Sequence, residues 1–412
     1  INPGGLGEAV ILPYYTVNND LNTVITINNS TSMTKAIKIN FREGKAGITV
    51  LSFNLYLAPN DMWTAALAPD VSTVVGHVGE QSVRLFMNDQ SCAPFLVSGQ
   101  EFLPFEIDAE SGDTDLFRSR EGYIEVIEMG ELDPSFGMGL NATFSFSGGN
   151  NCTAIQAAYE FDGIWGSEAG DFNEQLLPVK GGLVANLGII DVAEGLMYSM
   201  DGLAFESFFP ENSIFHTSPG DTKVPSLADA ETTSVVILNG LPVSTEWDHG
   251  YQAISALLMK DQIESFYDLN PNLAAKTEVV LSMPTKRFYQ NIENAVELPF
   301  IDTESEQYNA CAIFDVGVFD RDTSTNICTN DPGGWGIGCH SSKATIDNPN
   351  LTPIPPGVDN DRYLCHAVSV LDMRLESTNG ANESSKILGS QSFQNSDVVG
   401  FESGKMLMAF EQ

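Results

Sequence analysis

The chain has 412 residues and is strongly acidic, with 19 Lys and Arg against 55 Asp and Glu and a formal net charge of -36 at pH 7. Such a charge repels the phosphates of nucleic acids and the anionic surfaces of membranes, so we expect neither as a partner. Hydrophobic residues make up 42% of the chain, enough for globular cores, and the length favours two domains over one.

The sequence predicts an exported protein. It contains no run of about 18 apolar residues, so no membrane-spanning helix is expected. The first residues, from Ile1 to Gly5, include no initiator methionine. We interpret them as the start of a mature chain after removal of a signal peptide, although a trimmed chain would look the same. We therefore expect a secreted protein of the extracellular cell surface.

Six cysteines agree with export, because an even number without a C-x-x-C pair indicates disulfides and not a zinc knuckle or a thioredoxin-like site. Six cysteines allow about fifteen pairings. We predict three bridges: Cys92 with Cys152, Cys328 with Cys339 across a glycine-rich loop, and Cys311 with Cys365. The alternative is a set of buried free thiols in a cytosolic protein.

Strands are predicted in the first part of the chain. Residues 37–42 and 51–57 alternate apolar with polar side chains, which is the period of a half-buried strand. Residues 23–27 form a β-branched run, and further strands are predicted at 82–87 and 123–129. Short strands joined by polar turns are typical of antiparallel sandwiches.

We therefore predict a mainly β fold, built of antiparallel β-sandwich domains of the immunoglobulin-like or jelly-roll-like kind, with one or two short helices and long disulfide-held loops. The first sandwich is expected at residues 1–175. A second β-rich domain is expected at residues 176–412, with a disulfide-held loop region at about 311–365.

The second half contains one helical pattern. Asp248 is a candidate N-cap, and Ala256, Met259, Ile263 and Phe266 would then lie on one face of the helix. Strands are predicted on either side of the Asn- and Gly-rich region. They lie at residues 278–283 and 406–410, and the second would tie the C-terminus into a sheet.

Several segments carry a resemblance. They are Leu12-Pro13-Tyr14-Tyr15-Thr16-Val17, Phe41-Arg42-Glu43, Phe53-Asn54-Leu55-Tyr56-Leu57, Trp63-Thr64-Ala65 and Met283-Pro284-Thr285-Lys286-Arg287-Phe288-Tyr289. In them the chain resembles a group of uncharacterised secreted bacterial surface proteins, and the resemblance spans most of the chain. It implies a Gram-negative, cell-surface origin and brings no catalytic residues to carry over.

No catalytic motif occurs in the sequence, so we predict a protein that is not an enzyme. The histidines are scattered, without H-E-x-x-H spacing, and no serine lies in a G-x-S-x-G pattern. A triad assembled in space is left open, because triads are recognised by geometry and not by sequence order. An unrecognised secreted hydrolase is therefore the third hypothesis for function.

Calcium is the cofactor that the sequence favours most. Hard cations bind closely spaced carboxylate, amide and carbonyl oxygens on tight loops. The candidate ligands are Asp108, Glu110, Asp113 and Asp115 in one loop and Asp320, Asp322 and Asn326 in another. Residues 359–361 are a weaker third group. The alternative for each group is a solvated acidic loop.

Our first hypothesis for function is a non-enzymatic structural subunit of an extracellular assembly such as a filament, sheath or surface layer. Secreted sandwiches often polymerise by strand addition, in which one chain completes the sheet edge of another, so the expected partner is a second copy of the chain. The apolar, glycine-led residues 6–17 are the candidate donated strand. The alternative is that they pair within their own subunit.

The second hypothesis is a secreted, calcium-dependent glycan-binding module or adhesin. Trp165, Trp247 and Trp335 lie in loops rich in Gly and Asp, where exposed aromatic rings could stack on surface glycans. The alternative is that these rings pack beneath the loops.

Overall fold

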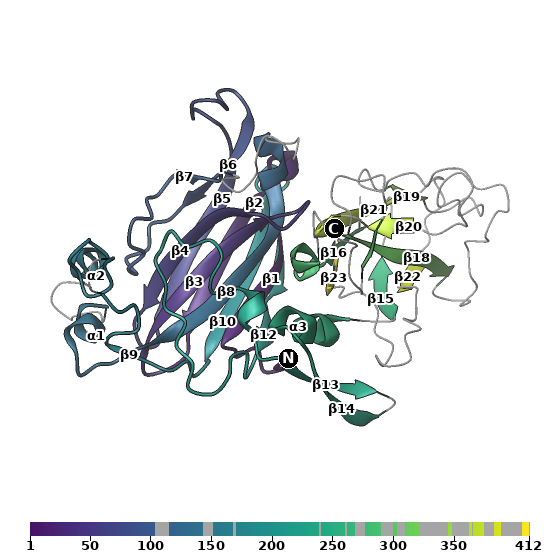
Figure 1. The fold of residues 1–412 in the computed structure, drawn as a ribbon. Coiled ribbons are helices and arrows are strands. Elements are labelled where there is room, and N and C mark those ends of the chain that lie inside the picture. Colours follow the sequence, from purple (N-terminus) through teal and green to yellow (C-terminus); the bar gives the residue numbers. More distant parts are fainter. Residues whose placement is uncertain are drawn as a thin grey trace. The chain divides into compact units, whose positions relative to one another are not determined.

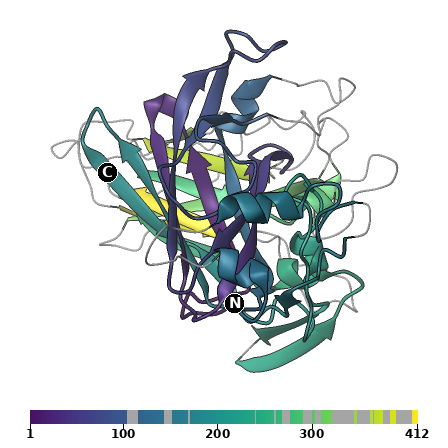
Figure 2. The same cartoon turned by 90° about the vertical axis from the view of Figure 1, so that its left-hand side faces the viewer.

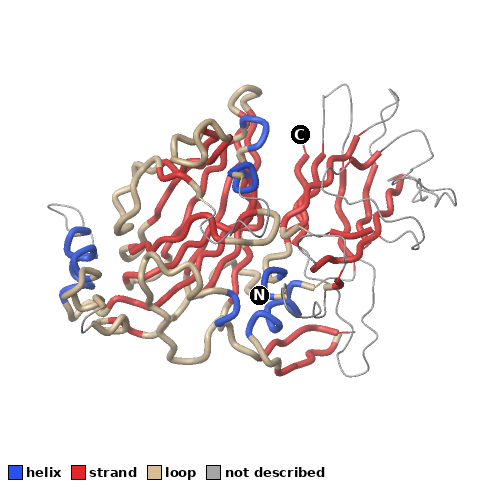
Figure 3. Tube along the Cα trace, turned by 45° about the horizontal axis from the view of Figure 1, so that its top comes forward, coloured by secondary structure: helices blue, strands red, loops and turns tan. Residues whose placement is uncertain are grey.

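The structure, a computed structural model, is mainly β with antiparallel sheets and few helices, as the sequence predicts (Figures 1 and 3). The chain divides into two units, Ile1–Ile254 and Ser255–Gln412. The structure describes residues 1–103, 115–142, 151–167, 170–238, 240–259, 262–267, 277–289, 300–302, 310–320, 345–347, 362–364, 366–374, 383–388 and 406–411.

Two sheets form the sandwich of unit 1 (Figure 1). Sheet I has the order β12 (Leu203–Phe205), β1 (Ala9–Thr16), β8 (Glu121–Leu132), β3 (Thr34–Glu43) and β4 (Thr49–Leu57), and β9 (Leu176–Leu177) also pairs with β8. Sheet II has the order β11 (Leu196–Asp201), β10 (Leu183–Asp191), β2 (Asn22–Asn29), β5 (Met62–Val71), β6 (Gln81–Phe86) and β7 (Gln100–Glu101).

Aromatic side chains fill the space between the two sheets. The rings of Phe41 on β3 and Phe102 lie 4.9 Å apart, and Tyr15 on β1 packs edge-on against both. Phe53 on β4 contacts Trp63 on β5 at 5.7 Å, which joins sheet I to sheet II. All five side chains are buried, and for Phe41 and Phe53 the alternating pattern predicts this.

The boundary between the units lies further along the chain than the sequence indicates. We expected the first domain to end at residue 175, yet β9, β10 and β12 all belong to the sheets of unit 1. In particular, β10 pairs with β2 from Asn22 to Asn29. Such pairing between distant segments leaves no local signal in the sequence, so local patterns could not place the boundary.

The half-buried strands expected at residues 37–42 and 51–57 are buried on both faces. Every residue of β3 is buried, including Lys38, Asn40 and Arg42. By contrast, β2 in sheet II alternates buried with partly exposed residues along its whole length. The polar face of sheet I is therefore covered by another part of the chain.

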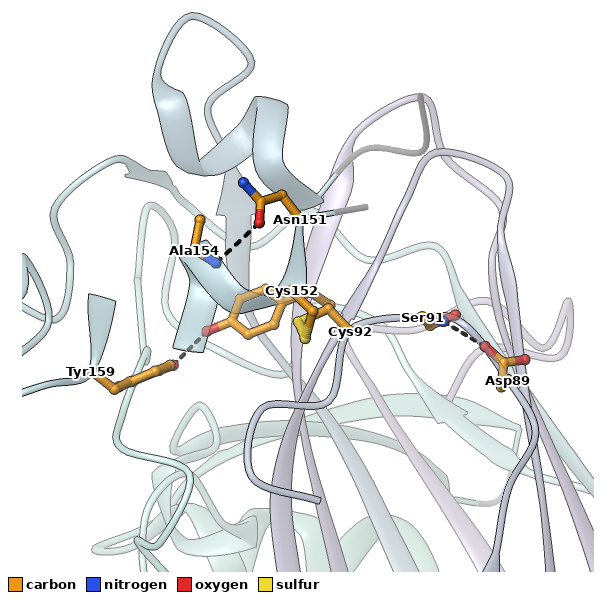
Figure 4. Close-up of a disulfide and its surroundings, with 8 residues drawn as sticks. Asp89, Ser91, Cys92, Asn151, Cys152, Ala154 and Tyr159 are labelled. Carbon is orange, nitrogen blue, oxygen red and sulfur yellow. Dashed lines mark hydrogen bonds between the residues drawn. A yellow bond between two sulfur atoms is a disulfide. The ribbon is translucent and has the colours of Figure 1, made fainter. Parts of the chain in front are cut away.

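Short helices lie at one side of the sandwich, at the left in Figure 1. They are α1 (Gly137–Ala142) and α2 (Cys152–Ala158), and a disulfide between Cys92 and Cys152 attaches α2 to the loop beside β4, confirming the predicted pairing. Figure 4 shows this bond together with the N-cap of α2, where the side chain of Asn151 accepts a hydrogen bond from the Ala154 N–H at 3.3 Å. Among the helices of the described residues, none has the length and hydropathy needed to cross a membrane.

A two-stranded hairpin follows the sandwich, formed by β13 (Thr233–Leu238) and β14 (Leu241–Glu246). Helix α3 (Gly250–Leu258) comes next and is shorter than predicted, because Ile263 and Phe266 belong to β15 (Gln262–Tyr267). Pairing of β15 with a strand more than 100 residues later in the sequence thus overrides a local helical period.

Unit 2 contains two antiparallel sheets. The first has the order β15, β22 (Glu383–Leu388), β18 (Ala310–Asp320) and β17 (Ile301–Asp302), with β20 (Arg362–Leu364) also paired to β18. The second has the order β19 (Thr345–Asp347), β21 (Val368–Arg374), β16 (Thr277–Ser282) and β23 (Met406–Glu411). The strands predicted at 278–283 and 406–410 are confirmed, and they pair with each other.

The predicted loop region at 311–365 contains strands β18, β19 and β20. In β18 the apolar residues of the sequence Ala-Ile-Phe-Asp-Val-Gly-Val-Phe form a strand that the cysteine-based interpretation overlooked. Cys311 is disulfide-bonded, with its partner outside the described residues. The proposed bridges to Cys365 and between Cys328 and Cys339 involve residues outside the described part of the chain.

Removing the disulfide of unit 1 is expected to destabilise the protein. The bond closes a loop with a sequence separation of 60 residues, and the chain-entropy model assigns about 4 kcal/mol to such a loop. The double variant Cys92→Ala/Cys152→Ala should lower the free energy of unfolding of unit 1 by roughly 2–4 kcal/mol in urea titrations without reductant. An unchanged urea midpoint would contradict this assignment.

Candidate functional site

Residues 213–225, which we call the strap, cover the outer face of sheet I (Figure 1). The strap has almost no regular secondary structure of its own. Backbone hydrogen bonds join it to neighbouring segments near its start: the Phe215 N–H donates to the carbonyl of Met129 on β8 at 2.8 Å, and the Ser213 carbonyl accepts from the Val179 N–H at 3.1 Å. A segment of this kind leaves buried carbonyl groups that need donors from elsewhere.

Side chains of sheet I supply those donors. Lys38 Nζ donates to the carbonyls of Ser218 at 2.7 Å and Asp221 at 3.2 Å. Asn54 Nδ2 donates to the Thr217 carbonyl at 2.8 Å. Two weaker bonds run from Asn40 to Pro225 and from Thr49 to Thr222. The polar residues of β3 and β4 therefore face the strap, and not solvent.

An ion pair lies in the same layer. Arg42 donates from Nε at 3.1 Å and from Nη2 at 2.9 Å to Glu125 Oε2 on β8, and Asn40 Nδ2 lies 3.3 Å from the same oxygen. Arg42 also donates to Thr49 Oγ1. Both charged side chains are buried, so removing either one would leave a charge in a dry environment without its partner.

Burial also changes the ionisation of Lys38. It lowers the pKa of the Lys38 ammonium from 10.5 to about 7, and the nearby Asp221 carboxylate only partly opposes this shift. The ammonium is fully buried, and its donors are used by strap carbonyls. Its role is therefore to hold the strap.

A second set of contacts fixes the strap through His216. Tyr56 on β4, Tyr159 just after α2 and His216 on the strap meet in one hydrogen-bonded cluster, which we call the Tyr–His cluster. His216 Nε2 lies 2.6 Å from Tyr56 Oη and 2.8 Å from Tyr159 Oη, and the two hydroxyls also contact each other. Asn54 Nδ2 donates to Tyr159 Oη at 2.8 Å. Trp165 covers the cluster, stacked on Tyr56 at 5.9 Å and edge-on to His216 at 4.5 Å.

The hydrogen bonds fix the tautomer of His216. Its Nδ1 lies 2.5 Å from the Phe172 carbonyl, which can only accept, so Nδ1 carries the proton and Nε2 accepts from tyrosine. Burial lowers the pKa of His216 to about 3. The hydrogen bond to the Phe172 carbonyl opposes this shift, and the nearby Lys38 charge adds to it. Burial also raises the pKa of both tyrosines. All three groups are thus held neutral near pH 7.

The Tyr–His cluster has residue types that occur in catalytic sites, but its geometry favours a structural role. His216 is only 3% exposed, and the polar atoms of the cluster bind one another or backbone carbonyls. The cluster joins sheet I, the α2 region and the strap, so its clearest function is to lock these three together.

Two further buried charge groups stabilise the sandwich. Lys35 Nζ lies 2.8 Å from Glu128 and 2.6 Å from Glu131. Glu128 also accepts from the Gly181 N–H at 2.7 Å. Burial raises the pKa of Glu128 to about 7, although Lys35 and these bonds counteract the rise.

At the other end of β3, the Glu43 carboxylate organises the turn that follows. It accepts hydrogen bonds from the N–H groups of Lys45 and Ala46 at 2.8 Å and of Ile48 at 3.1 Å, and it pairs with buried Arg118 at 3.1 Å. The glycine-punctuated turn therefore forms around a fixed carboxylate.

Most predicted calcium ligands lie outside the described residues, which leaves that prediction open. These are Asp108, Glu110, Asp113, Asp322 and Asn326. Asp115 is described and caps a short 3-10 helix by accepting from the Phe117 N–H at 2.9 Å, and Asp320 ends β18. Within the described part of the chain, no group of three or more His, Cys, Asp or Glu side chains could hold a metal ion.

Trp165 and the N-terminal segment do not have the exposure that the functional hypotheses require, and Trp335 lies outside the described residues. Trp165 is 1% exposed and packs in the Tyr–His cluster, so it is not available to stack on a glycan. Trp247 is half-buried and donates to Ser234 Oγ at 2.8 Å. The candidate donor segment pairs within its own chain, because β1 lies between β8 and β12.

The exposed apolar residues of unit 1 include groups on a hairpin and on a sheet edge. On the β13–β14 hairpin, Val235, Ile237 and Leu241 are 55%, 71% and 68% exposed. Val235 and Ile237 alternate along β13 and so lie on one face of the hairpin. At the edge of sheet II, Met197 on β11 is 61% exposed. These two apolar surfaces are the candidate interaction sites.

Comparison with models of known protein families, with characterised proteins and with solved structures finds no match for this chain. Its function must therefore be inferred from the arrangement of its own residues.

Neutralising Lys38 is expected to loosen the strap. The variant Lys38→Met keeps the length of the side chain but removes the hydrogen bonds from Lys38 Nζ to the carbonyls of Ser218 and Asp221. Among the described residues, these carbonyls then keep only the Asp221 N–H at 3.0 Å and Ser52 Oγ at 3.3 Å as donors. We expect the free energy of unfolding to fall by about 2 kcal/mol. The matched control is Lys180→Met, whose side chain is exposed and whose effect should stay within about 0.5 kcal/mol. Equal urea midpoints for the two variants would contradict the role given to Lys38.

His216 is expected to make the protein sensitive to acid. Because its pKa is lower in the folded chain, at about 3, than the ordinary 6.5, the unfolded chain binds the extra proton between these values. The stability that neutral His216 contributes is complete above pH 6.5 and is lost as the pH falls towards 3, by at most about 1.4 kcal/mol per pH unit. The difference in unfolding free energy between wild type and His216→Gln should therefore shrink from pH 7 to pH 4. A difference that stays constant would show that His216 does not titrate with this shift.

Proposed function

We propose that this chain is an exported, non-enzymatic structural subunit that associates with other copies of itself in an extracellular assembly. The observation that carries the proposal is the β13–β14 hairpin with its exposed apolar face. A two-stranded hairpin is marginal by itself in water and gains stability from a further strand or a packed surface. Among the described strands, β13 and β14 pair only with each other.

The charge distribution favours the hairpin as an interaction site. In a chain with a net charge of -36, two copies repel each other over most of their surface. The hairpin from Thr233 to Glu246 carries one charged residue, Glu246, at its base. Contact there avoids like-charge repulsion and buries Val235 and Ile237, so this surface suits self-association.

The buried structure of unit 1 supports a mechanical role. The Cys92–Cys152 bond and the strap hold the sandwich together by covalent and buried polar contacts. Disulfides persist in oxidising compartments, which supports an extracellular location. A rigid sandwich that presents an apolar hairpin is a suitable repeating unit for an assembly.

Self-association can be tested on the full chain by light scattering after size exclusion and by electron microscopy. We expect the mass to rise with protein concentration, and to rise more in high salt because ions screen the repulsion. The variant Ile237→Lys should shift the protein towards monomers. The control Val75→Lys, at a residue that is 94% exposed elsewhere, should associate like wild type. A wild-type chain that stays monomeric at every concentration and salt would refute the proposal.

A further inference from the structure

The edge of sheet II at β11 is open to pairing. β11 is the last strand of the sheet, and β10 is its only neighbour among the described strands. Met197 and Leu196 are 61% and 41% exposed, and Val192 in the preceding turn is 71% exposed. An edge strand presents backbone N–H and C=O groups, and natural proteins usually protect such edges with charges or proline.

β11 lacks those protective features along most of its length. Its sequence, Leu-Met-Tyr-Ser-Met-Asp, contains neither proline nor lysine, and its only charge is Asp201 at the end. The side chain of Met197 lies against Gly188 on β10, so this part of the edge is apolar. A strand that docks here meets an apolar, uncharged surface.

The hairpin offers a strand of matching length and chemistry. β13 and β11 both have six residues. β13 is rich in β-branched residues and carries no charge, whereas β14 contains Pro242, which has no N–H to donate to a neighbouring strand. β13 is therefore the better pairing partner of the two.

The two surfaces lie at opposite sides of unit 1. In Figure 2 the β10–β11 hairpin is at the left of the molecule and β13–β14 is at the lower right. Within one copy, β13 and β11 therefore cannot pair unless the fold of unit 1 changes. Between copies, a contact of two different surfaces is heterologous, and it extends into a chain of subunits unless its rotation closes a ring.

We propose that β13 of one copy adds as an antiparallel strand to the β11 edge of the next copy, so that the hairpin extends sheet II of its neighbour. This inference rests on the proposed self-association and names its two surfaces. A second copy is the favoured occupant because both surfaces are apolar and nearly free of charge in a chain with a net charge of -36. A basic partner would instead seek the carboxylates that both segments lack over most of their length.

Two complementary variants test this pairing. Ile237→Lys blocks the hairpin and leaves β11 intact, and Met197→Lys blocks the edge and leaves the hairpin intact. Both residues are exposed, so circular dichroism and thermal unfolding should match wild type. Each variant alone should be monomeric, with at least a tenfold weaker association measured by analytical ultracentrifugation. An equimolar mixture should give dimers and nothing larger, because one good hairpin and one good edge remain.

The outcomes separate this inference from the proposed function. If wild type assembles and Met197→Lys assembles equally well, or if the mixture stays monomeric where wild type assembles, the β11–β13 pairing is wrong while self-association stands. If wild type never assembles, both are wrong. The control Val75→Lys adds the same charge at another exposed apolar residue and should leave assembly unchanged.

Discussion

The hydrogen bonds between the outer face of sheet I and the strap are the interaction on which unit 1 depends. Without the strap, Lys38, Asn40 and Asn54 would lie on an open sheet face, and without those side chains the carbonyls of Thr217, Ser218 and Pro225 would lose the hydrogen bonds that sheet I donates. Each side therefore makes burial of the other tolerable. The Tyr–His cluster fastens the same segment at its other end through His216. Unit 1 consequently has a sandwich core on one face of sheet I and a polar core on the other.

This arrangement explains how a very acidic chain can keep a fixed fold while some apolar residues stay exposed on its surface. Most apolar residues of unit 1 are enclosed by the sheets or beneath the strap, and the polar core fixes the strap in one register. Apolar residues also remain exposed on several loops, on β5 and β6, and on two segments that carry little charge, the β13–β14 hairpin and the β11 edge. Repulsion between copies then limits association to those low-charge segments, which is the physical basis of the proposed assembly.

The sequence predicted the inner face of the sandwich well, because Ile37, Ile39 and Phe41 follow the two-residue period of a strand against an apolar core. It also predicted the Cys92–Cys152 bond. The sequence did not predict the outer face of sheet I. Polar residues such as Lys38 and Arg42 give a strand the same alternating pattern whether water or the strap covers them. One signal in the sequence was that residues 38–54 contain several Asn, Lys, Arg and Ser at alternating positions, while the distant residues 213–225 are rich in Ser, Thr and Pro. The pairing of β10 and of β15 with distant strands also leaves no local pattern. For this reason the first domain was predicted to end too early, and the predicted helix was too long.

Hydrogen–deuterium exchange of the full chain, compared below and above the concentration at which it associates, tests the account most directly. Backbone amides of the strap around Phe215 and His216 should exchange slowly in both conditions, because the polar core holds them in every copy. Amides of β13 and β11 should exchange quickly in the dilute protein and become protected on association. Fast exchange in the strap, or new protection confined to other segments, would contradict the account.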